Sequence, residues 1–355
     1  MSFDLATYPI WLNLGVFLTG ACLVWFAGNR LAQTADEISE RTGITKALAG
    51  ALLLGGATSL PEIATTVTAS GLGNASLAVN NLFGGVAMQL ALLALIDFLM
   101  VKGALTFAAP EPVLLLSGVL LTLQIAVGVT AIASGDISLF GYLGFWPWVI
   151  MAVYLLSLVA MNRFARNEAW VPAELPETPG ETEKKRQEEV GFKSPSSLIR
   201  LWAGFAIVCS LVLLGGFLVS STADALAEQT GLAGGFVGAT FVAMTTSLPE
   251  ISTTAGAIRL GGYTMAISNI FGTNSLEVAL LLPSDLAYLG GPIVNAVDQS
   301  VVFMGGVGII LTSLYLWGLL ERRDRTVARM GIDSCWVASI YILSLFILYT
   351  ISGTT

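Results

Sequence analysis

Two carboxylates lie deep in apolar stretches of this chain, each beside a proline and two hydroxyl groups. Glu62 and Glu250 each end a copy of the pentapeptide Thr-Ser-Leu-Pro-Glu, and they are 188 residues apart (250 − 62). An ionised carboxylate in such surroundings is costly unless a cation or a proton neutralises it. These stretches hold no Lys or Arg apart from Lys46 and Arg259 at their edges. We therefore expect the two acids to bind a mobile cation.

Further oxygen-bearing side chains recur at the same offset. Residues spaced by three or four share one face of a helix, so the hydroxyls of each pentapeptide fall near its carboxylate. The apolar stretch that follows each pentapeptide carries polar residues at intervals of four. The candidate metal ligands are Glu62, Glu250, Glu277, Gln89, Thr58, Ser59, Thr246 and Ser247. Three more polar residues are candidates either for secondary cation ligands or for contacts between helices: Asn81, Asn269 and Thr273.

Each pentapeptide should also break its helix. Pro61 lacks an N–H and its ring displaces the carbonyl of Ala57, and Pro249 does the same to Thr245. Carbonyls freed at membrane depth need another helix, water or an ion as a partner. For each hydroxyl, an alternative to metal binding is a hydrogen bond to the carbonyl four residues earlier in its own helix.

The available ligands favour a hard cation. The chain has no histidine, and its cysteines, Cys22, Cys209 and Cys335, lie in apolar segments that predict no disulfide framework. Carboxylate, amide, hydroxyl and carbonyl oxygens suit Ca²⁺, and Na⁺ by the same logic. Three carboxylates brought together would not all ionise in an empty site, so a cation or a proton must be held there.

The composition indicates an integral membrane protein. Of 355 residues, 55% are hydrophobic and 11% are charged, the mean hydropathy is +0.79, and the charges crowd into short stretches. A span needs about 20 apolar residues, so the sequence predicts an all-α protein with ten transmembrane helices. The expected spans lie near 9–28, 45–70, 76–99, 110–133, 139–161, 201–220, 232–258, 263–283, 295–320 and 334–352. The N-terminus has Asp4 and no basic residue, so we expect the first span to be retained.

The ten spans divide into two halves of five. Because five is odd, the second half must enter the membrane the opposite way up, which makes an inverted-topology repeat. The odd-numbered connections carry Lys and Arg, whereas the even-numbered ones carry Asp136, Asp224, Glu228 and Asp285 without any Lys or Arg. The positive-inside rule then places the odd-numbered connections in the cytoplasm and both termini outside.

This organisation predicts three parts of the chain. Residues 1–161 form the first five-helix repeat and residues 201–355 form the second, inverted one. Between them, residues 162–200 combine proline, mixed charge and no apolar periodicity, which is typical of a flexible linker. The charge pattern places this linker in the cytoplasm.

With these residues established, the chain resembles the cation/calcium exchanger superfamily, on its sodium/calcium exchanger branch and of the prokaryotic type. The resemblance rests on two alpha-repeats, near 34–99 and 222–287, with their paired Thr-Ser-Leu-Pro-Glu signatures. It implies a secondary-active antiporter of a prokaryotic cytoplasmic membrane that exchanges Ca²⁺ for Na⁺ by alternating access. It assigns Glu62 and Glu250 as acidic ligands shared by both ions, with Gln89 and Glu277 as the remaining amide and acid.

The resemblance also implies that the first and sixth spans slide past the others, and Gly15, Gly20, Gly215 and Gly216 are compatible with such motion. The chain departs from the family pattern in two ways. Gly85 stands where the family has a serine that helps to form a sodium site, and Gln89 and Glu277 are each one methylene longer than the common Asn and Asp. These departures leave the sodium stoichiometry open, since a proton could replace sodium.

Two other transport functions therefore stay open: an antiporter of Ca²⁺ or another divalent cation for H⁺, and a cation channel. An enzyme is not expected, because Ser59 and Ser247 have no histidine partner. The expected partners are inorganic cations and the lipid bilayer. No cofactor, nucleic acid or protein partner is indicated.

Overall fold

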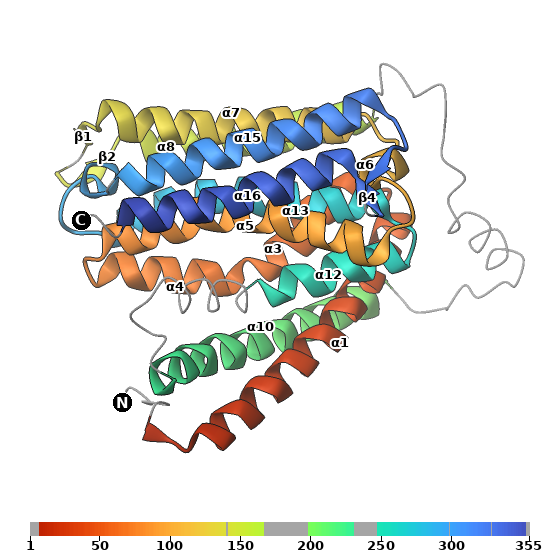
Figure 1. Cartoon of the computed structure of the whole chain (residues 1–355), viewed down its shortest axis with the longest axis horizontal. Helices are drawn as coiled ribbons and strands as arrows, with labels where there is room; N and C mark the ends of the chain where they lie inside the picture. Colours follow the sequence, from red (N-terminus) through yellow and green to blue (C-terminus); the bar gives the residue numbers. More distant parts are fainter. Residues whose placement is uncertain are drawn as a thin grey trace, which may run out of the picture.

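The computed structural model describes residues 7–139, 141–166, 198–230, 247–297, 299–327 and 329–352. Long helices run roughly along the long axis of the molecule (Figure 1). The first half contains α1 (Ile10–Thr42), α2 (Lys46–Leu48), the π-helix η2 (Ala49–Leu54), α3 (Gly55–Thr58), α4 (Leu60–Gly71), α5 (Ala75–Met100), α6 (Leu105–Ala108), α7 (Val113–Ser134), β1 (Ser138–Leu139), β2 (Leu143–Gly144) and α8 (Trp146–Arg166). The second half contains α10 (Leu198–Gln229), α12 (Leu248–Arg259), α13 (Tyr263–Ala279), α14 (Leu281–Ala287), the 3₁₀ helix η3 (Ile293–Ala296), α15 (Gln299–Glu321), β3 (Thr326–Val327), β4 (Met330–Gly331) and α16 (Ile332–Ser352).

The two halves repeat the same order of elements. The helices α10, α12 and α13 begin 188 residues after α1, α4 and α5 (198 − 10, 248 − 60 and 263 − 75). Each half also has a short antiparallel hairpin, β1–β2 or β3–β4, before its last helix. In Figure 1 α1 and α10 lie side by side and run in opposite directions, so equivalent helices of the two halves are antiparallel there.

Within the described ranges, eight helices are long and apolar enough to cross a membrane: α1, α5, α7, α8, α10, α13 continued by α14, α15 and α16. They coincide with eight of the ten expected spans. The expected span 45–70 is not one continuous helix, and only the end of the expected span 232–258 falls in the described part. The ten-helix count therefore stays a prediction.

The first helix is longer than the sequence indicated. We expected a span near 9–28, but α1 continues to Thr42. Apolar residues keep a helical spacing beyond the segment that is long enough to cross the membrane. Leu31, Ala35 and Ile38 in this extension are fully buried, which stabilises the longer helix. Gly43 then ends the helix in a left-handed conformation with φ 72°.

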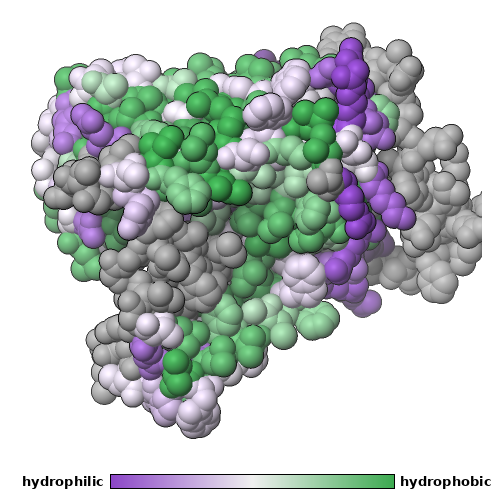
Figure 2. All heavy atoms as spheres, in the orientation of Figure 1, coloured by the Kyte–Doolittle hydropathy of each residue, from purple (hydrophilic) through white to green (hydrophobic). Residues whose placement is uncertain are grey.

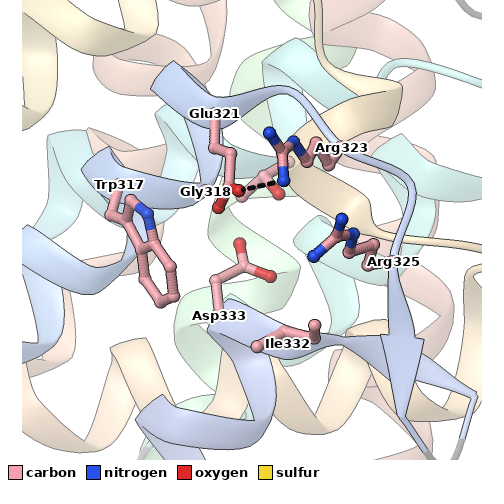
Figure 3. Close-up of a pocket in the computed structure, with 8 residues that line it drawn as sticks. Trp317, Gly318, Glu321, Arg323, Arg325, Ile332 and Asp333 are labelled. Carbon is pink, nitrogen blue, oxygen red and sulfur yellow. Dashed lines mark ion pairs between the residues drawn. The ribbon is translucent and has the colours of Figure 1, made fainter.

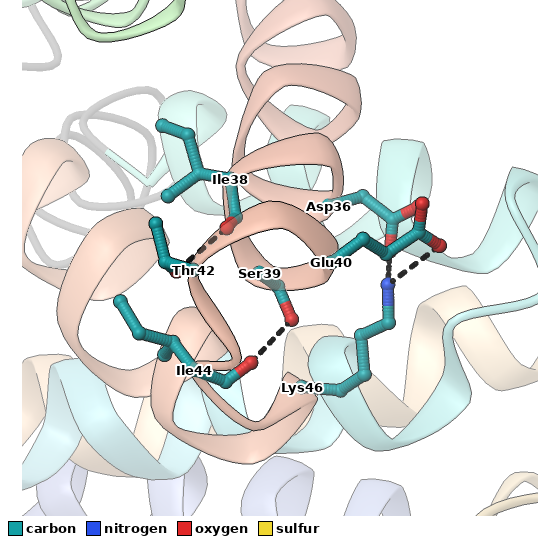
Figure 4. Close-up of polar contacts among 7 residues, drawn as sticks. All are labelled: Asp36, Ile38, Ser39, Glu40, Thr42, Ile44 and Lys46. Carbon is teal, nitrogen blue, oxygen red and sulfur yellow. Dashed lines mark hydrogen bonds and ion pairs between the residues drawn. The ribbon is translucent and has the colours of Figure 1, made fainter. Parts of the chain in front are cut away.

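Polar contacts hold the turn between α1 and α2 (Figure 4). Lys46 forms ion pairs with Asp36 and, at 3.4 Å, with Glu40. The Ser39 hydroxyl donates to the Ile44 carbonyl at 2.6 Å. This turn fixes the end of α1 relative to η2, and η2 and the following α3 pack against α13.

The helices α1 and α10 pack as a pair, set at an angle to the remaining helices (Figure 1). Their backbones approach closely at two glycines. A Cβ added at Gly20 would lie 3.2 Å from the Gly215 carbonyl oxygen, and a Cβ added at Gly215 would lie 3.2 Å from that of Gly20. Larger residues at either position would force the pair apart.

Two buried aspartates link the halves reciprocally. Asp97 of α5 accepts the N–H of Leu105 at 3.2 Å and that of Gly331 in β4 at 3.0 Å. Its counterpart Asp285 of α14 accepts the N–H of Ile293 at 2.8 Å and that of Gly144 in β2 at 2.7 Å. Each carboxylate therefore ties its own half to the hairpin of the other half.

This arrangement corrects one expectation from the sequence. Asp285 was expected in an even-numbered connection between spans, but it lies in α14 and its side chain is fully buried. It is buried because two backbone donors satisfy its carboxylate, which a count of loop charges does not reveal.

Candidate functional site

The first pentapeptide forms a break between two helices. α3 ends at Thr58 and α4 begins after Ser59, with Pro61 in its first turn, where a missing N–H costs little. Thr58, Ser59 and Glu62 are buried. The hydroxyls of Thr58 and Ser59 donate to the carbonyl of Gly55, at 3.2 and 2.8 Å. The expected alternative of bonding within the same helix is thus present, and it leaves the hydroxyl oxygens free to accept or to bind a cation.

The second pentapeptide opens α12. Ser247 precedes the helix, Pro249 lies in its first turn, and the Glu250 side chain is fully buried. Thr246 lies outside the described residues. Neither carboxylate oxygen of Glu250 accepts a hydrogen bond of good geometry from any described residue. An acid with such an environment needs a neutralising partner.

The structure brings the three candidate acids together. Glu62 lies close enough to Glu250 and to Glu277 for repulsion between their charges, and Glu250 acts in the same way on Glu277. Thr58 lies beside the Glu250 carboxylate. Acids from both halves therefore share one buried region.

Gln89 and Glu277, the candidate ligands in the stretches that follow the two pentapeptides, contact each other directly. The Gln89 amide of α5 donates to the Glu277 carboxylate of α13, and both side chains are buried. Nearby, the Asn274 amide donates to the Val86 carbonyl at 3.4 Å. Both pairs join residues separated by 188 positions, so equivalent points of α5 and α13 face each other at the centre of the molecule.

Asn81 and Asn269 make contacts between helices. Asn81 donates from α5 to Thr66 of α4 at 3.3 Å. Asn269 donates from α13 to Thr254 at 2.9 Å and to Thr253 at 3.1 Å, both in α12. The expected role in helix packing is thus present at both positions. The Asn269 side-chain oxygen is still buried without a donor among the described residues.

Several oxygen atoms in this region are buried without a hydrogen bond from the described parts of the chain. They are both carboxylate oxygens of Glu250, Oε2 of Glu277, Oε1 of Gln89, Oδ1 of Asn269, Oγ1 of Thr273 and Oδ1 of Asn274. Buried polar atoms are normally paired, so such a group calls for an explanation. Oxygen atoms of these types are the ligands of hard cations.

No three acidic, histidine or cysteine side chains within the described ranges converge tightly enough to hold a metal ion alone. A cation bound here would therefore need amide, hydroxyl or carbonyl oxygens besides the carboxylates. The buried oxygen atoms without hydrogen bonds from the described residues are of carboxylate, amide and hydroxyl type. Such a mixture suits a cation that takes many weak ligands better than one that needs a compact cluster of acids.

Sequence reasoning missed two residues. Asn274 is fully buried with an unpaired oxygen, and its position directly after Thr273 in a buried helix could have marked it. Asp97 was not singled out, although its match with Asp285 at the offset of 188 was visible in the sequence.

A separate cavity of about 120 Å³ lies at one end of the molecule, between α6, α15 and α16 (Figure 3). Trp317, Glu321, Arg323, Arg325 and Asp333 line it. Glu321 and Arg323 form an ion pair at 3.1 Å. None of the residues that line this cavity is a candidate cation ligand, so it is distinct from the region of the acids.

Comparison with solved structures reveals the same fold. Structures of the sodium-calcium exchanger NCX_Mj superpose with a TM-score of 0.69 or 0.70, cover 95% of this chain and 99% of theirs, and share 18% of residues. Among curated proteins, the inner membrane protein YrbG of Escherichia coli strain K12 is 26% identical and covers 94% of this chain and 98% of its own length. The putative antiporter CaxA of Alkalimonas amylolytica is 24% identical, with 94% and 97% covered.

The family model for the sodium/calcium exchanger protein matches residues 12–163 and 200–352. Its members are transporters, not enzymes. By this match over most of its length, the chain is an integral membrane protein that belongs to the sodium/calcium exchanger protein family.

Proposed function

We propose that this protein is a secondary-active antiporter that exchanges Ca²⁺ for Na⁺ by alternating access at the buried site of Glu62, Glu250, Glu277 and Gln89. One observation carries the proposal: the carboxylates of Glu250 and Glu277 are buried, and no ion pair to Lys or Arg is found for either within the described residues. A mobile cation supplies the missing charge. An empty, charged site is unfavourable to carry across the membrane, which favours exchange over leak.

In this proposal Thr58, Ser59, Ser247 and Thr273 add oxygen ligands, and Thr246 does the same in the second pentapeptide. The site forms between two inverted five-helix repeats, residues 1–161 and 201–355, which is why acids from both halves meet. The antiparallel course of α1 and α10 and the common offset of 188 support this symmetry. Their close approach at Gly20 and Gly215 would make α1 and α10 slide together.

The proposed orientation places both termini outside and the linker 162–200 in the cytoplasm of a prokaryotic cell. Hydrophilic side chains gather at the end of the molecule where α6 and β4 lie, and apolar side chains cover much of the surface between the ends (Figure 2). The predicted cytoplasmic connections contain Lys102 and Arg322, which lie next to α6 and α15. The positive-inside rule assigns this end to the cytoplasm.

H⁺ is the alternative counter-ion. Gly85 lacks the hydroxyl that its counterpart Thr273 provides, so the two halves do not offer the same ligands to a monovalent ion. The site would then exchange Ca²⁺ or another divalent cation for protons. A relative named as a putative antiporter leaves both counter-ions open.

Uptake of radiolabelled Ca²⁺ into proteoliposomes, with sodium and pH gradients imposed separately, tests this function. We expect saturable uptake driven by an outward sodium gradient, and Glu62→Gln and Glu250→Gln should each abolish it. Glu40→Gln is the control, because Glu40 lies at the surface near Lys46. Uptake driven only by pH would establish the proton alternative, conductance without saturation would indicate a channel, and normal uptake by both glutamine variants would overturn the site.

A further inference from the structure

The Glu277 carboxylate fills the space beside Gly85. A Cβ placed on Gly85 would lie 2.9 Å from Oε2 of Glu277 and 3.2 Å from Oε1. Real Cβ atoms do not approach other atoms so closely, so a side chain at position 85 and the present position of Glu277 exclude each other. No other atom of the neighbouring helices is as close to that point.

The same carboxylate is also held on its other side. Gln89 lies one helical turn after Gly85 on the same face of α5, and its amide donates to Glu277. Glu277 therefore extends from α13 to α5, where its carboxylate lies beside Gly85 and accepts a hydrogen bond from Gln89. The flexible end of Glu277 could move away from an added Cβ, but this movement would change its hydrogen bond with Gln89.

The two halves carry different residues at the positions equivalent to Gly85 and Gln89. Gly85 corresponds to Thr273, and Gln89 corresponds to Glu277, at the offset of 188. Thr273 occupies its own position with a hydroxyl that lies 2.9 Å from the place of a Cβ on Gly55. At this pair of equivalent positions Gly85 lacks a side chain and Thr273 has one, and the acid beside Gly85 comes from the second half.

We propose that Gly85 is a positioning residue that sets the place of the Glu277 carboxylate in the cation site. The proposal rests on the proposed function, because it assigns Glu277 to the transported cation. A side chain at position 85 moves the carboxylate away from Gln89 and from the other acids, and this weakens Ca²⁺ binding. Shortening Glu277 by one methylene makes room for that side chain.

The test is a double-mutant cycle with Gly85→Ala, Glu277→Asp and the combined variant. Gly84→Ala is the matched control, since a Cβ on Gly84 meets no atom within 4 Å. The readout is the Ca²⁺ concentration for half-maximal uptake in proteoliposomes. Displacing a positioned group beside a metal commonly weakens affinity by about 10- to 100-fold, so we expect an increase of that order for Gly85→Ala and none for Gly84→Ala.

The combined variant decides the proposal. We expect its half-maximal Ca²⁺ concentration to be lower than that of Gly85→Ala alone, because the aspartate clears the added methyl group. If the two substitutions multiply their effects, or if Gly85→Ala behaves like Gly84→Ala, the inference is wrong. Wild-type protein that takes up no Ca²⁺ under any gradient would instead refute the proposed function. Thermal unfolding of the same four variants would then still measure whether positions 85 and 277 are coupled.

Discussion

At the scale of single residues, the buried oxygen atoms around Glu250 make the folding of this region energetically unfavourable. Both oxygens of Glu250 and one of Glu277 lack hydrogen-bond donors within the described residues. Burying charge in this way is destabilising unless a partner compensates it. A cation that binds here would therefore stabilise the folded protein as well as being its substrate.

This argument predicts stabilisation by ligand. At a Ca²⁺ concentration about 100 times the Kd, binding to the folded state adds about 2.7 kcal/mol. We expect Ca²⁺ to raise the midpoint of thermal unfolding of the purified protein in detergent, and Glu250→Gln to remove that increase. Mg²⁺, which dehydrates reluctantly, should have a smaller effect. An equal shift in wild type and Glu250→Gln would place the binding ion elsewhere.

The sequence could predict that candidate residues of the two halves are related by a fixed offset, whereas their role as cation ligands stays a prediction. The offset of 188 pairs Gln89 with Glu277, and the structure joins these two side chains directly. The sequence could not reveal which side-chain oxygens accept a hydrogen bond and which stay without a donor. Asn269 uses its amide hydrogens on two threonines of α12 and keeps its oxygen unpaired, because that depends on the angle between two helices.

At the scale of elements, Asp97 and Asp285 explain how the hairpins are held against helices of the opposite half. Each aspartate accepts two backbone N–H groups, one from each half. Backbone donors do not appear in side-chain patterns, which is why this pairing escaped prediction. The π-helix η2 escaped for the same reason: proline marks the break near Ser59, but nothing in residues 49–54 marks a change of helix type.

Removal of these carboxylates should loosen the hairpins. A buried donor left without an acceptor costs about 1–3 kcal/mol, so Asp97→Ala or Asp285→Ala, each of which leaves two donors, should destabilise the protein by about 3 kcal/mol. Asp97→Asn keeps one acceptor oxygen and should fall between the alanine variant and wild type. Thermal unfolding measures the order. Asp97→Ala and Asp285→Ala melting like wild type would show that the hairpins are held by other contacts.

The two asparagine contacts offer a comparison between elements. Asn269 is fully buried with two threonine partners, whereas Asn81 is exposed with one. Because the loss of a hydrogen bond costs more in a buried place, Asn269→Ala should lower the unfolding midpoint more than Asn81→Ala. Equal effects on thermal unfolding would mean that these hydrogen bonds do not stabilise the packing of α12 on α13 and of α4 on α5.

At the scale of the whole molecule, the two asparagines differ in their exposure. They are equivalent in the repeat, yet only Asn81, near the start of α5, is exposed. Under the proposed alternating access, one of two equivalent routes would be open at a time. The exposure of Asn81 would then place the open route at the end where α4 finishes and α5 begins, which faces the outside in the proposed orientation.

The orientation itself can be measured with single cysteines in a variant from which Cys22, Cys209 and Cys335 have been removed. Leu72 follows α4 and is 81% exposed, and Lys102 is an exposed residue that follows α5. In intact cells, a membrane-impermeant thiol reagent should label Leu72→Cys and leave Lys102→Cys unlabelled until the membrane is opened. Because the positive-inside rule depends only on where Lys and Arg lie, labelling in the reverse order would invert the whole assignment, with the termini and the linker exchanging sides. Labelling of both cysteines in intact cells would mean that α5 does not cross the membrane, and it would contradict the proposed inverted repeat.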